Sequence, residues 1–173
     1  MANKLDRVVL VDPNDTELGT DDKMAAHREG RLHRACSVFV FDTAGSLLLQ
    51  QRAPEKYHSA GLWSNTCCTH PAPGESPEEA AHRRLDEEMG FDCQLRWAFG
   101  FVYRVPLDHE LTEHEYDHVF VGHARSEPQP DAREVSAWRW ADATTIQREM
   151  REHPETYTEW FKLAFPRVLA TQA

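Results

Sequence analysis

Short apolar runs divide the chain into segments that predict strands and helices. Residues 37–41 and 46–52 are rich in apolar side chains, and they flank the turn-forming segment Asp42-Thr43-Ala44-Gly45. Two such runs around an Asp…Gly turn are typical of a β-hairpin. Similar runs predict further strands over residues 95–105, 118–124 and 137–141.

The clearest helix in the pattern spans residues 77–89. Ser76 can cap its first turn, and Glu79 three residues later completes a capping box. A proline at the first helical position and Gly90 after the last residue mark the two ends. Three residues spaced by four form a narrow stripe for burial: Ala81, Leu85 and Met89.

Two more helical segments, at about residues 142–152 and 155–169, follow the last predicted strand. The order is therefore strands, one central helix, more strands and then helices. This order predicts an α+β fold with a mixed sheet flanked by helices. A length of 173 residues, 40% of them hydrophobic, suits a single domain over residues 1–173 with one substantial core.

The formal net charge of −10 narrows the classes of partner. Nucleic acids and anionic membranes need a basic footprint, so we expect neither as the main partner. No run approaches the roughly 20 apolar residues of a membrane helix, and residues 8–11 form too short an apolar run for a signal peptide. Four cysteines without C-x-x-C spacing indicate free thiols in a reducing cytoplasm. They are Cys36, Cys67, Cys68 and Cys93.

The central helix also carries a pattern of charges. Residues four apart share a helix face, so Arg84 lies beside Glu88, and Arg83 lies beside Glu87. Taken alone, this spacing favours a solvated helix face with ion pairs. The preceding segment changes that interpretation, because a loop bearing proline and glycine before a helix that ends in Glu-Glu-x-Gly resembles the Nudix box.

The resemblance to the Nudix box has one informative departure. The positions that match in register are Glu75, Arg83, Leu85, Glu87, Glu88 and Gly90. Thr69 replaces the first glycine, Phe91 replaces the last aliphatic residue, and Arg84 replaces the central glutamate. Arg84 removes one carboxylate from the metal-binding set of the Nudix hydrolases. It introduces a cation suited to holding a phosphate, so this departure points away from hydrolysis.

Further motifs resemble the type 1 isopentenyl-diphosphate isomerases over about residues 10–160. The string at residues 61–71, with Trp-x-Asn and Cys-x-His-Pro, is diagnostic of that family together with Glu113-His114-Glu115. Four other segments occur in the family's order, at residues 23–27, 31–33, 51–53 and 103–104. The resemblance implies a Nudix-like fold and the isomerisation of isopentenyl diphosphate to dimethylallyl diphosphate in isoprenoid biosynthesis.

Histidines and glutamates supply the metal site that the resemblance implies. Glu113 and Glu115 are two residues apart, so on a strand their side chains leave the same face. With His27, His33 and His70 they offer nitrogen and carboxylate ligands, which suit a divalent transition metal such as Mn²⁺ or Zn²⁺. Any one histidine alone is more often a surface or capping residue, and we interpret the other seven in that way. These are His58, His82, His109, His114, His118, His123 and His153.

The isomerisation requires an acid and a base. Protonating the alkene produces a tertiary carbocation, so one group must donate a proton, another must remove one, and water must be excluded. The resemblance implies Cys68 as the proton-removing group and Glu115 as the proton donor, with Tyr103 beside it. Trp160 aligns with an aromatic residue over the cation, where a ring face contributes about 0.5–2 kcal/mol. The same tryptophan also fits an ordinary core stripe.

An acidic chain that binds a diphosphate must gather its few bases in one pocket. The resemblance implies four phosphate contacts, Lys23, Arg52, Lys56 and Arg84. For Lys56 the alternative is a solvated surface lysine, because the surrounding loop is polar. The resemblance also implies Mg²⁺ at the diphosphate, with Glu88 and Cys68 as protein contacts.

Two other functions fit parts of the pattern. The main alternative is a Nudix hydrolase of a nucleoside diphosphate derivative, and Arg84 together with Cys68 and Glu115 argues against it. The other is a catalytically silent protein that binds a metal or a prenyl phosphate, and the intact acid–base pair argues against that one. The expected partner is a small diphosphate, and the expected assembly is a monomer or a homodimer.

The adjacent cysteines allow a sharper prediction. In an extended segment consecutive side chains point to opposite faces, so only one of the two can enter the pocket. The pattern Cys-x-His-Pro selects Cys68, two residues before His70, and leaves Cys67 as a small buried packing residue.

Overall fold

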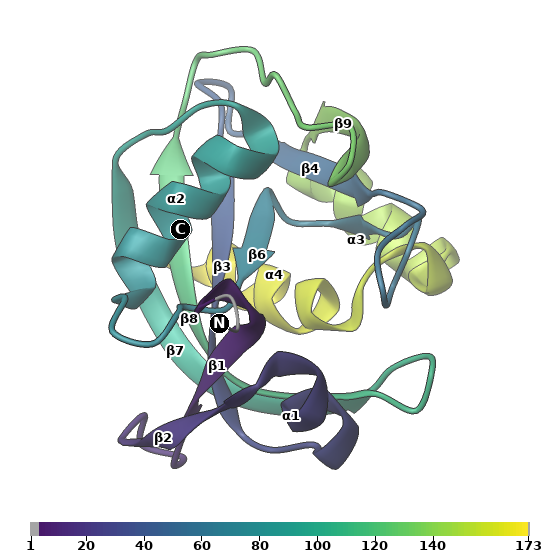
Figure 1. Cartoon of the computed structure of the whole chain (residues 1–173). Helices are drawn as coiled ribbons and strands as arrows, with labels where there is room; N and C mark the ends of the chain where they lie inside the picture. The colour runs from purple at the N-terminus through teal and green to yellow at the C-terminus, as the bar shows by residue number, and fades with distance from the viewer. Residues whose placement is uncertain (1–3, 173) are drawn as a thin grey trace.

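The structure is a computed structural model that describes residues 4–172 and contains a nine-stranded curved sheet (Figure 1). The strands are β1 (Arg7–Val11), β2 (Glu17–Asp22), β3 (His33–Phe41), β4 (Leu47–Arg52), β5 (Trp63–Ser64), β6 (Cys67–Thr69), β7 (Leu95–Pro106), β8 (Thr112–His123) and β9 (Val135–Ala141). The helices are α1 (Lys23–Glu29), α2 (Pro77–Met89), α3 (Ala143–Glu152) and α4 (Glu159–Gln172). Short 3₁₀ turns lie at Lys4–Asp6 and Pro154–Thr156.

Strand β3 is the centre of the sheet. One of its edges runs parallel to β8 along the whole strand, from the pair His33–Glu115 to the pair Phe41–His123. Its other edge pairs with β6 in the middle and reaches β1 and β4 at the two ends. Because the pairs β1–β2, β4–β9 and β7–β8 are antiparallel, the sheet is mixed, as predicted.

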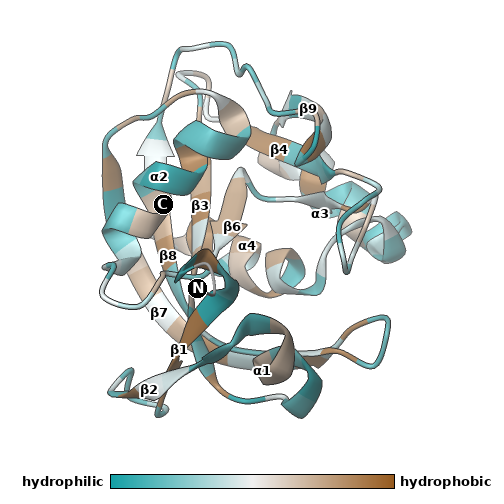
Figure 2. Ribbon diagram, in the orientation of Figure 1, coloured by the Kyte–Doolittle hydropathy of each residue, from teal (hydrophilic) through white to brown (hydrophobic). Residues whose placement is uncertain are grey.

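Alternating side chains of β3 contribute to a core on each face of the sheet. Phe39 and Phe41 pack with residues of α3 and α4 on one face, whereas Val38 and Val40 pack with α2 on the other. This period of two lets one strand serve both cores. Figure 2 shows hydrophobic strands beneath a helix α2 whose outer side is largely hydrophilic. The predicted α+β class is confirmed.

The helix predictions hold closely for α2 and α3. Helix α2 has both hydrogen bonds of the capping box, in which the Glu79 amide donates to Ser76 Oγ and the Ser76 amide donates to the Glu79 carboxylate. Gly90 ends the helix with a φ of 72°. Helix α4 begins at Glu159, later than predicted, because the residues before it form a 3₁₀ turn and an extended segment.

The strand predictions require correction at β3, β4 and β8. The predicted hairpin closes at its turn, where Phe41 pairs with Leu47, but the two strands then separate to different partners. Strand β8 begins at Thr112 instead of residue 118, and β3 begins at His33 instead of residue 37. The early part of β3 carries His33 and Arg34, and that of β8 carries His114 and three acids, and such residues conceal a strand from a count of apolar residues. The N-terminal elements β1, β2 and α1 were not predicted.

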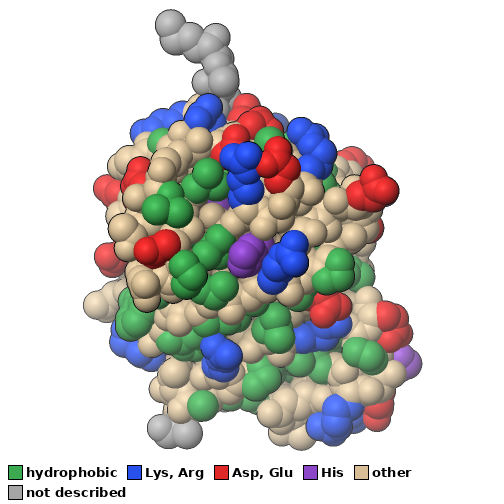
Figure 3. All heavy atoms as spheres, turned by 90° about the horizontal axis from the view of Figure 1, so that it is seen from below, with side chains coloured by type: hydrophobic (Ala, Val, Ile, Leu, Met, Phe, Trp, Pro, Cys, Tyr) green, Lys and Arg blue, Asp and Glu red, His purple; other side chains and the backbone are tan. Residues whose placement is uncertain are grey.

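The surface and the helices add two observations about the described part of the chain. None of its helices is both long enough and apolar enough to cross a membrane. On the face seen from below, Lys and Arg side chains are interspersed with Asp and Glu side chains (Figure 3). That face therefore has no single sign of charge.

The glycine that ends α2 allows a stability prediction. A Cβ at Gly90 would lie 2.3 Å from the main-chain oxygen of Gln129, whose amide is bonded to the Met89 carbonyl. We expect Gly90→Ala to lower the free energy of unfolding by about 3 kcal/mol, through left-handed strain and overpacking together. Gly45 is the control, since its φ of 82° is similar but nothing lies within 4 Å of an added Cβ. Gly45→Ala should cost about 1 kcal/mol. Equal losses in urea denaturation would contradict the overpacking.

Candidate active site

One cavity collects most of the predicted site residues. It has a volume of about 160 Å³ and is lined by residues from α1, β3, β4 and its following loop, β6, α2, β7, β8 and α4. The predicted residues that line it are Lys23, Arg52, Lys56, Cys68, His70, Arg84, Tyr103, Glu113, Glu115 and Trp160. His27, His33 and Glu88 are buried but are not part of the lining.

Sheet register explains how distant segments meet at this cavity. The parallel pairing of β3 with β8 sets His33 beside Glu115, 82 positions along the chain. Glu113 and Glu115 leave the same face of β8, and both are buried. Pairing of β6 with β3 sets Cys68 beside Ser37 and places it in the cavity wall. The adjacent Cys67 points to the opposite side, into the core beneath α2.

Ring nitrogens and carboxylates converge at the cavity in two overlapping groups. The ligand atoms of His27, His33, His70 and Glu115 lie within 4.8 Å of one another. A second group within the same limit contains His27, His58 and Glu113. His27 belongs to both groups, so the five predicted metal ligands form one continuous cluster of buried or nearly buried side chains.

The tautomers of two histidines suit a metal ion. The Nδ1–H of His27 donates to the Lys23 carbonyl at 2.7 Å, and that of His33 donates to the Arg31 carbonyl at 2.8 Å. Each ring therefore presents the lone pair of Nε2, and these two buried Nε2 atoms have no hydrogen-bond partner. Burial also lowers the pKa of His27, and lowers that of His70 to about 3. Neutral imidazoles with unused lone pairs are what a divalent metal requires.

Two of the predicted metal contacts lie outside this cluster. Among the described residues, neither group contains Glu88 or Cys68. Glu88 is on α2, where Oε1 accepts from Arg84 at 2.7 Å and Oε2 accepts from Gln50 at 2.7 Å. The Cys68 sulfur contacts Ser37 and Asn65 instead. Both residues belong to other parts of the cavity wall and its surroundings.

The interpretation of His58 as an ordinary surface or capping histidine is wrong. His58 is only 4% exposed and lines the cavity, with Nε2 3.6 Å from Glu113 Oε1. Burial, and then the neighbouring Arg52, lower its pKa to about 2, so the ring is neutral. In contrast, His82, His114 and His118 bond to Asp92, the Gly30 carbonyl and Asp15, and none of the three lines the cavity.

Glu115 has a short hydrogen-bonding contact at each of its two oxygens. Tyr103 Oη donates to Oε2 at 2.6 Å, and His70 Nε2 lies 2.8 Å from Oε1. Burial by itself would raise the pKa of Glu115, but the adjacent imidazoles of His33 and His70 outweigh burial and hold it well below its usual range. The neighbouring Glu113 has a raised pKa because it is buried beside the charge of Glu115. The pKa values of these two close carboxylates are thus shifted in opposite directions.

Trp160 belongs to the cavity and to the core at once. It lines the cavity, it is 3% exposed, and it packs in the hydrophobic cluster of α4. The Arg52 guanidinium lies 5.3 Å from its ring centre, and the His58 ring meets it edge-on at 5.8 Å. The two interpretations offered for this residue are therefore compatible with each other.

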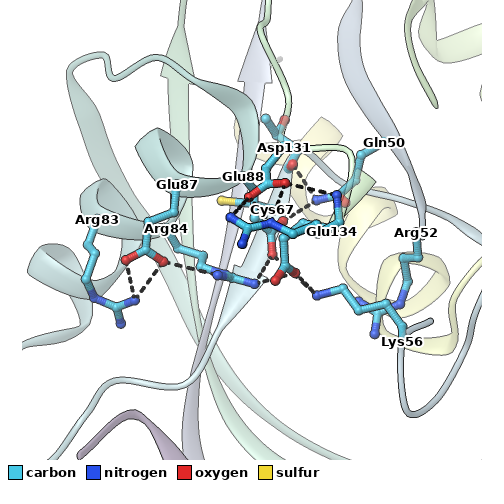
Figure 4. A network of polar contacts seen from close by, with 12 residues as sticks. Gln50, Arg52, Lys56, Cys67, Arg83, Arg84, Glu87, Glu88, Asp131 and Glu134 are labelled. Atoms are coloured by element: carbon cyan, nitrogen blue, oxygen red, sulfur yellow. Dashed lines mark hydrogen bonds and ion pairs between the residues drawn. The ribbon is translucent and has the colours of Figure 1, made fainter. Parts of the chain in front are cut away.

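Basic side chains also line the cavity. Lys23, Arg52, Lys56 and Arg84 all contribute to its lining. Burial, followed by the charges of Lys56, Arg84 and Arg52, lowers the pKa of Lys23 to about 8. The Lys56 side chain is only 16% exposed, so the alternative of a solvated surface lysine is wrong. Figure 4 shows Lys56 and Arg84 joined through a carboxylate that was not predicted, Glu134.

Comparison with known proteins identifies the family. Residues 31–161 match the family described as NUDIX domain. Isopentenyl-diphosphate Delta-isomerase 1 of Aromatoleum aromaticum is 53% identical over 165 residues, which are 95% of this chain and 93% of the relative. The isopentenyl-diphosphate Delta-isomerase of Burkholderia multivorans is 52% identical, over 94% of this chain and 92% of the relative. The chain belongs to the isopentenyl-diphosphate Delta-isomerase family.

Solved structures show that this isomerase-family chain has the Nudix fold. DR0079 from Deinococcus radiodurans has a TM-score of 0.77 at 19% identity, covering 92% of this chain and 98% of that one. The MutT protein from Methanosarcina mazei has a TM-score of 0.64 at 19% identity, covering 79% of this chain and 91% of that one. The predicted Nudix-like α+β fold is confirmed.

Three residues around Cys68 in this isomerase-family site were not predicted as site residues from the sequence, namely Asn65, Ser37 and Asp117. Asn65 Nδ2 donates to the Cys68 sulfur at 3.1 Å, and the Ser37 hydroxyl lies 3.5 Å from the same atom. Ser37 Oγ donates to the buried Asp117 at 2.7 Å. Burial, and then Glu115, raise the pKa of Asp117 to about 8, whereas burial and Asp117 raise that of the Cys68 thiol to about 12.

Sequence signals for these residues are uneven. Asn65 belongs to the Trp-x-Asn string, so the motif already marked its position. Asp117 continues the alternation of Glu113 and Glu115 along one strand face, which is a usable signal in retrospect. Ser37 and His58 carry no such pattern and become visible only when the strands are paired.

Proposed function

We propose that the chain isomerises isopentenyl diphosphate to dimethylallyl diphosphate in isoprenoid biosynthesis. The observation that carries the proposal is one cavity with three components. It combines the histidine and glutamate cluster, an acid–base pair of Glu115 (bonded to Tyr103) and Cys68, and a group of partly buried cations. Membership of the isopentenyl-diphosphate Delta-isomerase family supports the same reaction.

Two protein groups move the protons in the proposed mechanism. Because the pKa of the Cys68 thiol is raised and that of Glu115 is lowered, the reaction begins with an uphill transfer of the Cys68 proton to the Glu115 carboxylate. Glu115, bonded to Tyr103 at 2.6 Å, then delivers a proton to the terminal alkene carbon, and the electron pair of the double bond forms the new C–H bond. A tertiary carbocation remains at the branched carbon. Cys68, as the thiolate, removes a proton from the carbon nearer the diphosphate, and that C–H electron pair forms the shifted double bond. Asn65 Nδ2 donates to the sulfur and holds it in the cavity wall.

The aromatic wall suits the charge of the intermediate. The Trp160 ring lines the cavity and stabilises a cation near its face by about 0.5–2 kcal/mol. That contribution corresponds to roughly tenfold in rate. The burial of this α4 residue in the hydrophobic core also helps to exclude water, which would otherwise trap the carbocation as an alcohol.

The proposed metal ligands are His27, His33, His70, Glu113 and Glu115. A bound Mn²⁺ or Zn²⁺ would supply positive charge that sets the acidity and position of Glu115. The Nδ1 hydrogen bonds to the Lys23 and Arg31 carbonyls orient two of these rings toward the cluster. His58 contacts Glu113 from the far side and helps to position that carboxylate.

The diphosphate would bind among the cations that line the cavity. Lys23, Arg52, Lys56 and Arg84 supply N–H donors there, and charge-assisted hydrogen bonds to phosphate are among the strongest available. Mg²⁺ would accompany the diphosphate, with Glu88 and Cys68 as the proposed protein contacts. Arg84 holds the box position where a hydrolase would place a carboxylate. The whole chain acting as one domain, a cytoplasmic location, and a monomeric or homodimeric state remain predictions.

One assay separates this function from hydrolysis. Incubation with isopentenyl diphosphate should yield dimethylallyl diphosphate without detectable phosphate release, because Arg84 replaces a metal-binding carboxylate of the box. In deuterated water the new methyl group should gain deuterium through Glu115. Arg84→Glu should not create efficient hydrolysis, since one carboxylate does not assemble a site for an attacking water. Turnover of nucleoside diphosphate derivatives without isomerisation would instead establish the hydrolase alternative.

A further inference from the structure

One carboxylate outside the cavity lining joins two of the cations that face the cavity. Glu134 Oε2 accepts from Arg84 Nη2 at 2.7 Å and, in a short contact, from the Lys56 ammonium (Figure 4). Lys56 comes from the loop after β4, and Arg84 comes from α2. Among the described residues, Lys56 and Arg84 line the cavity and Glu134 does not. Glu134 therefore contacts both cations from outside the cavity lining.

The segment that carries Glu134 is itself held in place by main-chain hydrogen bonds. The Gln129 amide donates to the Met89 carbonyl at 2.8 Å, and the Asp131 amide donates to the Glu88 carbonyl at 3.0 Å. The Ala53 amide donates to the Glu134 carbonyl at 3.0 Å. The end of α2 and the start of the Lys56 loop are thus tied to the same short segment. Glu134 lies between them at a defined position.

Lys56 and Arg84 need such an anchor for electrostatic and conformational reasons. Two like charges side by side repel, and Lys56 lies in a loop outside any helix or strand. A flexible lysine loses conformational entropy when its side chain is fixed. Because the shared carboxylate fixes it before the ligand binds, ligand binding itself costs less entropy. The anchoring also leaves donors free. A lysine ammonium has three N–H groups, and a guanidinium has five.

The remaining donors of Arg84 can be counted from its contacts. Its Nη2 serves Glu88 and Glu134, and its Nη1 serves Glu87 at 3.1 Å. The Nε–H and the second Nη1–H are not used by these three carboxylates. Lys56 likewise spends one N–H on Glu134, and its distance to Glu88 Oε1 is 3.9 Å, beyond a hydrogen bond. Both side chains therefore keep donors for an anionic ligand.

We propose that Glu134 is a positioning residue for the diphosphate. It holds Lys56 and Arg84 side by side, so that the cavity meets the terminal phosphate with two pre-arranged cations. This deepens the proposed function, on which it rests for the identity of the substrate. Glu134 contacts no reacting atom, and its effect passes through the two cations.

Binding of inorganic pyrophosphate tests this role without the isomerase reaction. In calorimetric titrations with excess Mg²⁺, Glu134→Gln should weaken pyrophosphate binding by about tenfold, because one charge-assisted contact to each cation is lost. Glu134→Asp keeps the charge with a shorter reach and should weaken binding less. Glu127→Gln is the matched control, an exposed glutamate in the same β8–β9 connection, and should leave binding unchanged. Unchanged or tighter binding in folded Glu134→Gln protein would overturn the proposal.

A second measurement asks whether Glu134 acts through its neighbours. In a Lys56→Met background, Glu134→Gln should have a smaller effect on pyrophosphate affinity than in the unmodified protein, because residues in one network are non-additive. If the two substitutions lower pyrophosphate affinity additively, Glu134 does not act through Lys56. In the isomerase assay Glu134→Gln should raise KM about tenfold and change kcat less than about threefold. If pyrophosphate binding weakens as expected but no isomerisation occurs, the function fails and the positioning role stands.

Discussion

Cys68→Ala is expected to lower kcat by about 10³-fold or more while pyrophosphate still binds. The Cys68 sulfur is in the cavity wall, held by Asn65 at 3.1 Å, and alanine has no group that can remove a proton. Four other residues supply the cations that hold the diphosphate, so binding survives even though one proposed Mg²⁺ contact is lost. Steady-state kinetics beside a pyrophosphate titration measures the two effects independently.

Cys67→Ala is the matched control for this loss. Cys67 is 1% exposed and packs beneath α2, so its truncation should cost about 1 kcal/mol of stability and leave kcat largely intact. A thiol reagent should inactivate the protein, bound substrate should protect it, and peptide mapping should find the label on Cys68. If Cys67→Ala proves inactive and Cys68→Ala active, the assignment is displaced by one residue.

Removal of bound metal should have the second large effect. Exhaustive chelation is expected to abolish isomerisation. The buried Nε2 atoms of His27 and His33 have no hydrogen-bond partner and lie beside carboxylates, which is the arrangement that a bound metal ion would complete. His70→Ala should lower metal affinity by at least about 10²-fold. Elemental analysis of the purified protein measures the stoichiometry directly, independent of activity.

His153→Ala is the control for the metal experiment. Its side chain is 66% exposed and is not in the cavity lining, so metal content and activity should stay at the level of the unmodified protein. Full activity in protein that has been shown to be free of metal would rule out the proposed role of the cluster. Unchanged metal content in His70→Ala would remove His70 from the ligand set.

Some parts of the site could be read from local sequence. The capping box at Ser76 and Glu79 and the stop at Gly90 are local rules, and α2 follows them. The alternation of side chains along a strand placed Glu113 with Glu115 on one face and separated Cys67 from Cys68. The diagnostic motifs then identified the family. All of these signals involve residues within a few positions of one another.

Other parts depend on contacts between distant segments. The hairpin prediction assumed that β3 pairs with its neighbour in sequence, whereas β3 pairs along its length with β8, about 80 residues later. His58 resembled an ordinary histidine because its loop has no regular pattern, and only the fold carries it to Glu113. Glu134 is an unremarked acid in the sequence until Arg84 and Lys56 are found on either side of it.

The sequence by itself determined the boundaries of helix α2, the shared face of Glu113 and Glu115, the family, and the residue types available for acid, base, metal and phosphate chemistry. Only the tertiary structure decided which of these residues meet. The physical reason is that backbone periodicity is set by neighbours along the chain, whereas strand partners are chosen by the burial of both sheet faces. The parallel register of β3 and β8, and with it the contact of His33 with Glu115, is a property of the packed sheet.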